Sequence, residues 1–333
     1  MARVPARSRT PTIDDVARLA GVSRATASRA LFSEKRPVSL AKREQVQAAA
    51  ERLGYRINPL ARSLTTKRVN LVAVMVNHIH DLSDLDLFDR LAAETQAIGK
   101  QILLVRIGSG DKLEEFLRQG VAYHVDAALV FSDFGDADAA RRMFQSDHVL
   151  MLNGRHDGQS SAIVPDEGKG ITAAVADAAS KGVRSAALVS GRGSSAIEDA
   201  RILSYQHALA THGVALRQVV QGDYSYDSGR RASAMLAEAE MPDAVFCSSD
   251  AMAMGVLDAR RADFPAGRPT RFRLYGFDDV SLLGFGAYPI SSIGYDKAAF
   301  VREVVRFLGD PAGFGPKGTP VLVPTRFVPR LTG

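Results

Sequence analysis

The spacing of apolar residues divides the chain into two parts. Between residues 12 and 53, apolar side chains recur every three or four positions, which is the period of short helices packed by one face. From residue 69 onward, short and continuous apolar runs alternate with stretches of helical period. Strands buried on both faces that alternate with helices predict parallel β-sheets with crossover helices. The chain is therefore expected to combine a small helical unit with a larger α/β body.

The N-terminal periodicity predicts three helices. Thr12 is a suitable N-cap with acidic residues in the turn that follows it, and Gly21 ends the first helix. Ser23 is expected to cap a second helix that turns its small apolar residues inward, and a third helix is expected at about residues 39–53. Two helices joined by a tight turn that contains glycine form a helix-turn-helix, whose second helix can enter the major groove of DNA.

Seven apolar runs of the larger part are predicted to be strands. Their sequences are VNLVAVMV, QILLVRI, AALVFS, HVLMLN, SAALVSG, AVFCSSD and FRLYGFDD. Helical periodicity lies between them at residues 85–98, 170–180 and 196–212. By themselves, these elements fit either one large sheet or two lobes.

Charge is distributed unevenly between the two parts. Residues 1–68 contain 15 lysines and arginines against 5 aspartates and glutamates, whereas the rest of the chain contains 27 against 32. The basic part is suited to approach a polyanion. The single cysteine, Cys247, excludes an internal disulfide framework. Because no run of about 18 apolar residues and no signal-peptide pattern is visible, we expect a cytoplasmic protein without a membrane partner.

Two segments, TIDDVARLAGVSRATASRAL and REQVQAAAERLGYRINPLARSL, resemble the DNA-binding headpiece of the LacI/GalR family of bacterial transcription regulators. The resemblance implies a headpiece over residues 1–57, a hinge over 58–68, and an effector-binding and dimerisation domain over 69–333. That domain is expected to have two parallel α/β lobes of the periplasmic-binding-protein type I kind. The chain is expected to cross from one lobe to the other near residues 165, 293 and 320. The fold class is therefore α/β with a three-helix N-terminal headpiece.

The resemblance also implies which residues contact DNA. Arg24, Ala25 and Arg29 occupy base-reading positions, and the guanidinium of Arg29 matches the O6 and N7 atoms of guanine. In the hinge, Leu64 is expected to wedge between base pairs from the minor groove, although the residue types also fit an ordinary basic linker. The expected set is Thr12, Ser23, Arg24, Ala25, Thr26, Ser28, Arg29, Asn58, Leu60, Ala61, Arg62 and Leu64.

Polar residues at the expected strand ends are candidates for effector binding, because ligands of open α/β sheets bind there. By the resemblance, Arg201 clamps the effector with Asp278 as its usual partner, and Tyr224 is an aromatic platform. For Arg201 and Asp278, the alternative is a purely structural ion pair. Asp250 follows Ser249 in the segment CSSD, and the alternative for it is a helix cap. The expected set is Asp84, Asp86, Asp166, Arg201, Tyr224, Ser249 and Asp278.

The stretch NHIHDLSDLDLFDRLAAE, after the first strand, departs from the family pattern. Asp84 and Asp86 can accept hydrogen bonds from sugar hydroxyls or pair with a cationic ligand. His78, His80 and a carboxylate have side chains that can hold a metal ion, but a solvated loop at a helix start is favoured, so neither a metal nor a cofactor is expected. The effector is expected to be a polyol or sugar derivative, with a nucleoside or an amine-bearing compound as alternatives.

Together these patterns predict a DNA-binding transcriptional regulator, most simply a repressor, whose operator affinity depends on a small molecule. The expected partners are double-stranded operator DNA, the effector and a second copy of the chain, because two recognition helices read a palindrome. After VLVPTRFVPRLTG no heptad helix follows, which favours a dimer over a tetramer. The protein is not expected to be an enzyme, since SGRGSS lacks a Walker lysine and the dinucleotide spacing. A solute-binding protein without a DNA role is the alternative.

Overall fold

The computed structural model describes residues 11–32, 38–56, 69–79, 81–120, 123–155, 157–238, 240–315 and 318–333. The chain forms two compact units, Met1–Val69 and Asn70–Gly333. Within the described parts, every helix is too short or too polar to cross a membrane. The expected boundary between headpiece and hinge, at residues 57 and 58, lies outside the described residues.

The N-terminal unit consists of α1 (Ile13–Leu19), α2 (Arg24–Phe32) and α3 (Leu40–Leu53). The start of α1 is fixed by a capping box, in which Thr12 Oγ1 accepts from the Asp15 amide and the Asp15 carboxylate accepts from the Thr12 amide. Small apolar side chains from all three helices form one core, which contains Val16, Ala17, Ala20, Ala27, Ala30, Val46, Ala49 and Ala50. The three predicted helices are confirmed.

The larger unit is built on eleven strands within the described residues. They are β1 (Leu71–Val76), β2 (Gln101–Arg106), β3 (Ala127–Val130), β4 (Val149–Met151), β5 (Ser161–Asp166), β6 (Ser185–Ser190), β7 (Ala215–Gln221), β8 (Ala244–Cys247), β9 (Arg273–Phe277), β10 (Ser291–Tyr295) and β11 (Val321–Val328). Hydrogen-bonded neighbours follow the order β2-β1-β3-β4-β5-β11-β10-β9-β8-β6-β7, and each pair is parallel except β10 with β11. The seven predicted strands are confirmed.

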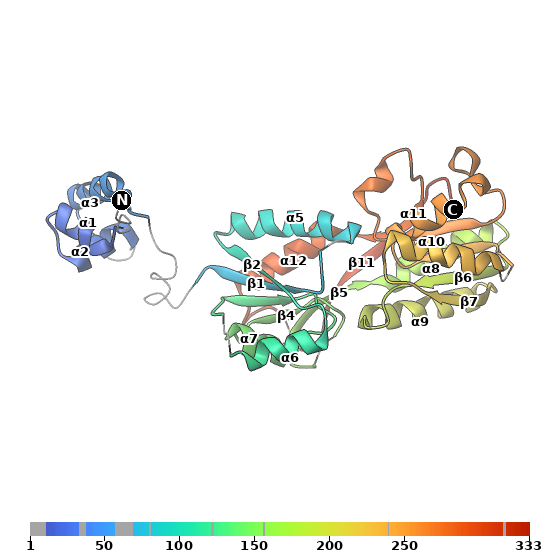
Figure 1. Ribbon diagram of the computed structural model, residues 1–333, viewed down its shortest axis with the longest axis horizontal. Helices are drawn as coiled ribbons and strands as arrows, with labels where there is room; N and C mark the ends of the chain where they lie inside the picture. Colours follow the sequence, from blue (N-terminus) through green and yellow to red (C-terminus); the bar gives the residue numbers. More distant parts are fainter. Residues whose placement is uncertain are drawn as a thin grey trace, which may run out of the picture. The chain divides into compact units, whose positions relative to one another are not determined.

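Helices cover both faces of each half of this strand order, which creates two lobes (Figure 1). In the first lobe, α5 (Leu82–Ala97) and α12 (Lys297–Gly309) contribute to one core, and α6 (Gly110–Arg118) and α7 (Ala137–Phe144) contribute to the other. In the second lobe, α8 (Glu167–Ser180) and α9 (Ala196–Thr211) lie opposite α10 (Tyr226–Glu238) and α11 (Asp250–Ala259). Within the residues that the structure describes, four separate cores therefore stabilise the unit.

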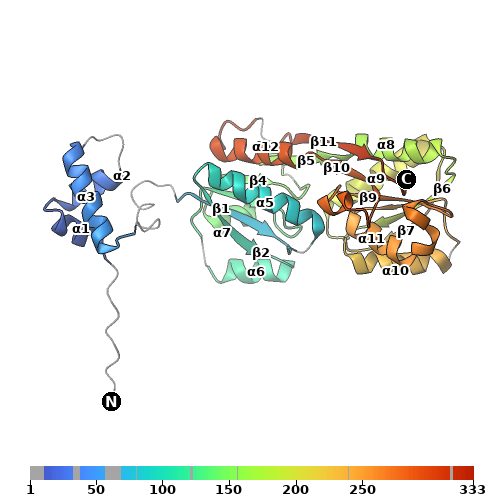
Figure 2. The same cartoon turned by 90° about the horizontal axis from the view of Figure 1, so that it is seen from above.

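The strands β5, β10 and β11 join the two lobes, which agrees with the crossings expected near residues 165, 293 and 320 (Figure 2). They occupy the middle of the strand order, between the sheet of the first lobe and that of the second. Because the remaining strands are parallel within each lobe, their carboxyl ends gather at one edge of each sheet. The fold thus positions a ligand site where these two edges meet.

Candidate effector cavity and recognition helix

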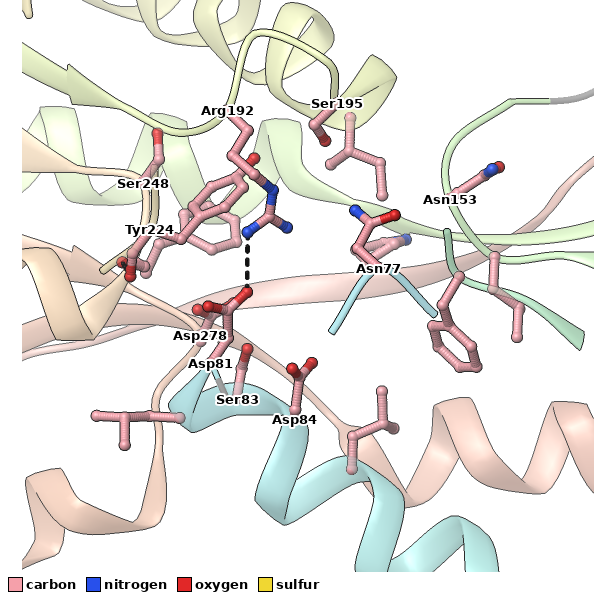
Figure 3. A pocket seen from close by; sticks show the side chains of 18 of the residues that line it. Asn77, Asp81, Ser83, Asp84, Asn153, Arg192, Ser195, Tyr224, Ser248 and Asp278 are labelled. Atoms are coloured by element: carbon pink, nitrogen blue, oxygen red, sulfur yellow. Dashed lines mark hydrogen bonds and ion pairs between the residues drawn. The ribbon is translucent and has the colours of Figure 1, made fainter. Parts of the chain in front are cut away.

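A cavity of about 180 Å³ lies between the two lobes and is lined by both (Figure 3). Seven strands each contribute a residue that follows their carboxyl end: Asn77, Phe131, Asn153, Arg192, Tyr224, Ser248 and Asp278. Aromatic rings complete much of the wall, namely those of Phe88, Phe131, Tyr224, Phe277, Tyr295 and Phe300. The lining therefore combines hydrogen-bonding groups with apolar faces, as small-molecule sites do.

Arg201 lines the cavity from α9 and is held by protein groups on all sides. Its Nε and Nη2 atoms donate to the two carboxylate oxygens of Glu167 at 2.8 and 2.7 Å, and Nη1 donates to the Ser248 carbonyl at 2.8 Å. Glu198, one helical turn earlier, accepts from Nη1 at 3.3 Å, and the guanidinium carbon lies 3.9 Å from the centroid of the Phe277 ring. Arg201 thus pairs with Glu167, the first residue of α8, and with Glu198 of its own helix, and no ion pair within 4.0 Å joins it to Asp278.

Tyr224 lines the cavity in a close-packed position. Its backbone has a φ of 70°, and its hydroxyl donates to Glu198 Oε2 at 2.8 Å. Burial raises the pKa of the Tyr224 phenol, and the negative charge of Glu198 adds to this. A Cβ atom at Gly191 would overlap the ring, so glycine is required for this close approach.

Ser249 also lines the cavity, but its hydroxyl is used within the protein. Ser249 Oγ accepts from the Met252 amide, which caps α11, and donates to the Tyr224 carbonyl. Asp250 is therefore not the helix cap. Its buried carboxylate accepts from Ser292 Oγ at 2.6 Å and from the Val280 amide at 2.9 Å, and burial raises its pKa.

Asp278 extends into the cavity from a strained turn after β9. Its φ is 101° and that of Asp279 is 46°, a conformation that side chains other than glycine rarely adopt. The turn is held by Lys297 Nζ, which donates to the Asp278 carbonyl at 2.7 Å. Burial raises the pKa of Asp278 to about 7, and the negative charges of Asp81 and Glu167 add to this, although Arg201 and Lys297 oppose it.

Of the remaining predicted carboxylates, Asp84 lines the cavity, whereas Asp86 and Asp166 do not. Asp84 lines the cavity from the first turn of α5, whereas Asp86 lies on another side of that helix and accepts from the Ser281 amide at 2.9 Å. Asp166 is also outside the lining. It follows Pro165 and precedes Glu167, which both line the cavity, and successive residues of a strand point to opposite sides.

Sequence reasoning missed Arg192, which joins the two lobes across the cavity. Its Nη1 atom lies 2.9 Å from His78 Nε2 and donates to Asp81 Oδ2 at 3.2 Å, while Nε lies 3.5 Å from Asp133 Oδ2. Its guanidinium carbon is 4.6 Å from the centroid of the Tyr224 ring. This arginine lies in the segment SGRGSS, whose glycines direct attention to phosphate-binding motifs that the segment does not match.

The expected metal-ligand candidates are partly brought together. Ligand atoms of His78, Asp81 and Asp84 lie within 4.8 Å of one another, while His80 is outside the described residues. The guanidinium of Arg192 already contacts His78 and Asp81. His78 and Asp81 of the first lobe therefore form a contact with Arg192 of the second lobe.

The recognition helix α2 presents its expected reading face to solvent. Arg24, Ala25 and Arg29 are exposed, and Ser23 Oγ accepts from the Thr26 amide at 3.2 Å. Arg29 Nε donates to the Ala25 carbonyl one turn earlier, at 3.2 Å. Thr26 and Ser28 are half-buried beside them, and the Thr12 hydroxyl is engaged in its capping box. The expected hinge contacts lie outside the described residues, namely Asn58, Leu60, Ala61, Arg62 and Leu64.

Both units match families of known proteins. Residues 12–58 match the bacterial regulatory proteins of the lacI family, and residues 175–332 match the periplasmic binding protein-like domain. The HTH-type transcriptional regulator CelR of Thermobifida fusca is 30% identical over 318 residues, which cover 91% of this chain and 92% of that protein. The HTH-type transcriptional regulator GalR of Escherichia coli is 32% identical over 297 residues, which cover 85% and 84%.

Solved structures show the same fold. The Lac repressor bound to ONPG in its repressed state has a TM-score of 0.83 and 22% identity, with 98% of this chain and 100% of that chain covered. A complex of the transcriptional regulator CelR with cellobiose has a TM-score of 0.68 and 26% identity, with 97% and 100% covered. With its helix-turn-helix, its two-lobed domain and relatives matched over most of their length, the chain belongs to the LacI family of bacterial transcriptional regulators.

Proposed function

We propose that this regulator binds operator DNA through α2 and that a sugar or polyol derivative in the cavity between the lobes sets its affinity for DNA. The observation that carries the proposal is the two-sided lining of the cavity, to which Asn77 and Asp84 contribute from the first lobe and Arg192, Ser248 and Asp278 from the second. A ligand that touches both lobes favours the arrangement in which both contacts are made. Binding can therefore be coupled to a change in how the lobes are arranged.

The chemistry of the cavity supports a polyhydroxylated ligand. Carboxylates and amides such as Asp84, Asn77 and Asn153 accept and donate hydrogen bonds to hydroxyl groups, and rings such as Phe88 and Tyr295 offer apolar faces for the C–H faces of a sugar. The related CelR structure is a complex with cellobiose. A nucleoside or an amine-bearing compound is the alternative effector.

We further propose that the protein acts in the cytoplasm as a homodimeric repressor on a near-palindromic operator and has no catalytic activity. One α2 helix reads few base pairs, and two-fold symmetry doubles the contact. The Lac repressor has been solved as a dimer bound to operator. Residues 58–68 are proposed to be the hinge, with Leu64 as its minor-groove wedge.

The experiment is a measurement of DNA affinity by fluorescence anisotropy, with palindromes selected from random sequence. Binding should exceed that to a scrambled duplex by roughly a thousandfold or more, and its logarithm should fall linearly with the logarithm of salt concentration. At least one member of a sugar and polyol panel should then change the affinity for the selected operator. A double Arg24→Ala and Arg29→Ala variant is the control, since it should lose DNA binding and keep its thermal response to the panel. Equal affinity for selected and scrambled duplexes would contradict the proposal.

A further inference from the structure

Negative charge predominates in the lining of the cavity. Among the lining residues that the structure describes, five carboxylates face two guanidinium groups, and they belong to Asp81, Asp84, Asp133, Glu167 and Asp278. A charged group in a partly dehydrated cavity is costly unless an opposite charge or hydrogen bonds compensate it. The pairing of these groups therefore determines which ligand charge the cavity accepts.

The two guanidinium groups are already committed to particular carboxylates. Arg201 forms a two-point ion pair with Glu167 and a longer contact with Glu198. Arg192 contacts Asp81 at 3.2 Å and Asp133 at 3.5 Å. An anionic ligand would have to displace these carboxylates before it could use either arginine.

Three of the five carboxylates pair with the guanidinium groups, and Asp84 has another interaction partner, so Asp278 is the carboxylate that remains. Across the described ranges of the chain, no hydrogen bond and no ion pair within 4.0 Å reaches its side chain, since Lys297 donates to the Asp278 carbonyl instead. Its turn is also strained, and a Cβ atom at Gly294 would overlap Asp279, so the surrounding structure is shaped to keep this turn. Strain retained beside a cavity is typical of groups that act on a ligand.

An aromatic ring lies beside this carboxylate. Tyr295 lines the cavity, and burial together with the charges of Asp278 and Asp84 raises the pKa of its phenol. Lys297 Nζ lies 5.5 Å from the centroid of the Tyr295 ring, so this ring already accepts a cation over one face. An ammonium group of a ligand placed here would meet carboxylate oxygens in the same surroundings. Figure 3 shows Asp278, Asp81 and Asp84 on the same side of the cavity, opposite Arg192.

We propose that the effector is a polyhydroxylated molecule that carries a protonated amine, such as an amino sugar or an aminopolyol, and that the carboxylate of Asp278 binds this ammonium group. This inference rests on the proposed role of the cavity as the effector site and names the charge of its ligand. The hydroxyl groups of such a ligand would bind to the amides and serines of the lining, and the ammonium group would balance part of the excess of carboxylates over guanidinium groups.

The test compares ligands that match in shape and differ in charge, on the full-length protein in a buffer free of primary amines. The first pair is tris(hydroxymethyl)aminomethane and pentaerythritol, in which a hydroxymethyl group replaces the ammonium. The second set is glucosamine, glucose and glucuronate, which share the pyranose ring. Titration calorimetry and the shift in unfolding temperature should show that the ammonium member binds more tightly than its neutral partner, by roughly tenfold, which corresponds to about 1.4 kcal/mol. The acid should bind more weakly than either.

Two variants assign the preference to Asp278. Asp278→Asn should abolish the advantage of the ammonium member over its neutral partner, so that the two members of a pair bind with similar affinity. Asp166→Asn removes a nearby carboxylate that is outside the lining, so it should keep the full advantage. Neutral members that bind as tightly as ammonium members, an advantage that survives Asp278→Asn, or binding by no member of either set would each overturn the inference.

Operator binding separates this inference from the proposed function. If neutral sugars release the operator and the ammonium members have no advantage, the ligand charge is wrong while the function holds. If DNA binding is absent or no compound of a broad sugar and polyol panel changes it, the proposed function itself fails.

Discussion

The recognition helix and the effector cavity are built in opposite ways. On α2, Arg29 is exposed and donates a hydrogen bond to the carbonyl of Ala25, four residues away. In the cavity, Arg201 is buried and its partners Glu167 and Ser248 are 34 and 47 residues away. Arg192 reaches 114 residues back along the sequence to His78. Side chains that read DNA must remain accessible, whereas side chains that shape a cavity need partners to hold them.

This contrast separates the effects of substitution. An exposed arginine on α2 stabilises little in the free protein, so its loss should affect DNA binding alone. A buried arginine in the cavity compensates carboxylates, so loss of one partner should affect folding as well as ligand binding. The predictions below test this division, beginning with the largest effect.

Removal of one carboxylate from the Arg201 cluster should cost the most. Glu167→Gln leaves part of a buried positive charge uncompensated, and we expect the larger unit to lose about 3 kcal/mol of its free energy of unfolding. Urea denaturation followed by circular dichroism measures this. Glu115→Gln is the control, because its pair with Lys112 is exposed and its loss should have little effect. A variant as stable as the parent would mean that the cavity pair is solvated.

Arg29→Ala should affect readout without affecting stability. We expect a loss of about 1 to 3 kcal/mol of discrimination at one base pair in each half-site, because a bidentate guanine contact disappears. Anisotropy titrations with single base substitutions in the operator identify the base pair, and the unfolding curve should match that of the parent. Equal weakening on operator and random DNA would remove Arg29 from the base-reading role.

Asp278→Asn should change how stability depends on pH. The pKa of Asp278 is about 7 in the folded protein and near 3.8 in the unfolded chain, so the folded state retains a proton that the unfolded state loses between these values. The free energy of unfolding therefore contains the full contribution of Asp278 below pH 4, and it falls as the pH rises to about 7. The asparagine variant should lack this decline and be more stable at pH 8, by about 1 to 2 kcal/mol after allowance for cavity water. Thermal unfolding across this range is the measurement, and a parallel decline in both proteins would assign it to other groups.

The smallest effect is expected at the helix cap of the N-terminal unit. Thr12→Ala removes the side-chain half of the capping box and should destabilise that unit by about 1 kcal/mol. Hydrogen exchange of the α1 amides reports this directly, and amides of the larger unit should exchange as before. Thr12→Ser keeps the hydroxyl and should restore protection. Faster exchange in the serine variant as well would assign the effect to the lost methyl group.

Much of the fold could be predicted because its signals are local. The caps at Thr12 and Ser23 act on amides three residues away, and the period of apolar residues shows which face of a helix is buried. Continuous apolar runs identified β1, β2, β3, β4, β6, β8 and β9. The edge strand β7 was not among the predicted strands because its exposed and half-buried residues interrupt the apolar run, and the antiparallel β11 contains Pro324 and Arg326.

The candidate site could be predicted only in part. The resemblance directed attention to Arg201, Tyr224, Ser249 and Asp278, which all line the cavity. It did not identify the carboxylates that pair with Arg201, because residue type alone does not say which of many acidic side chains will lie beside a buried cation. Asp86 and Asp166 have suitable side chains, but the direction of the helix and of the strand turns them away.

The sequence alone therefore determined the helix-turn-helix, the alternation of strands and helices, and the uneven distribution of charge between the two units. These features depend on contacts within a few residues or on composition. Tertiary structure decided the charge balance of the cavity, in which Arg192 and Arg201 are compensated while Asp278 has no ion pair within 4.0 Å among the described residues. That balance depends on distances between groups from different strands and helices, and only the packing of the two lobes sets those distances.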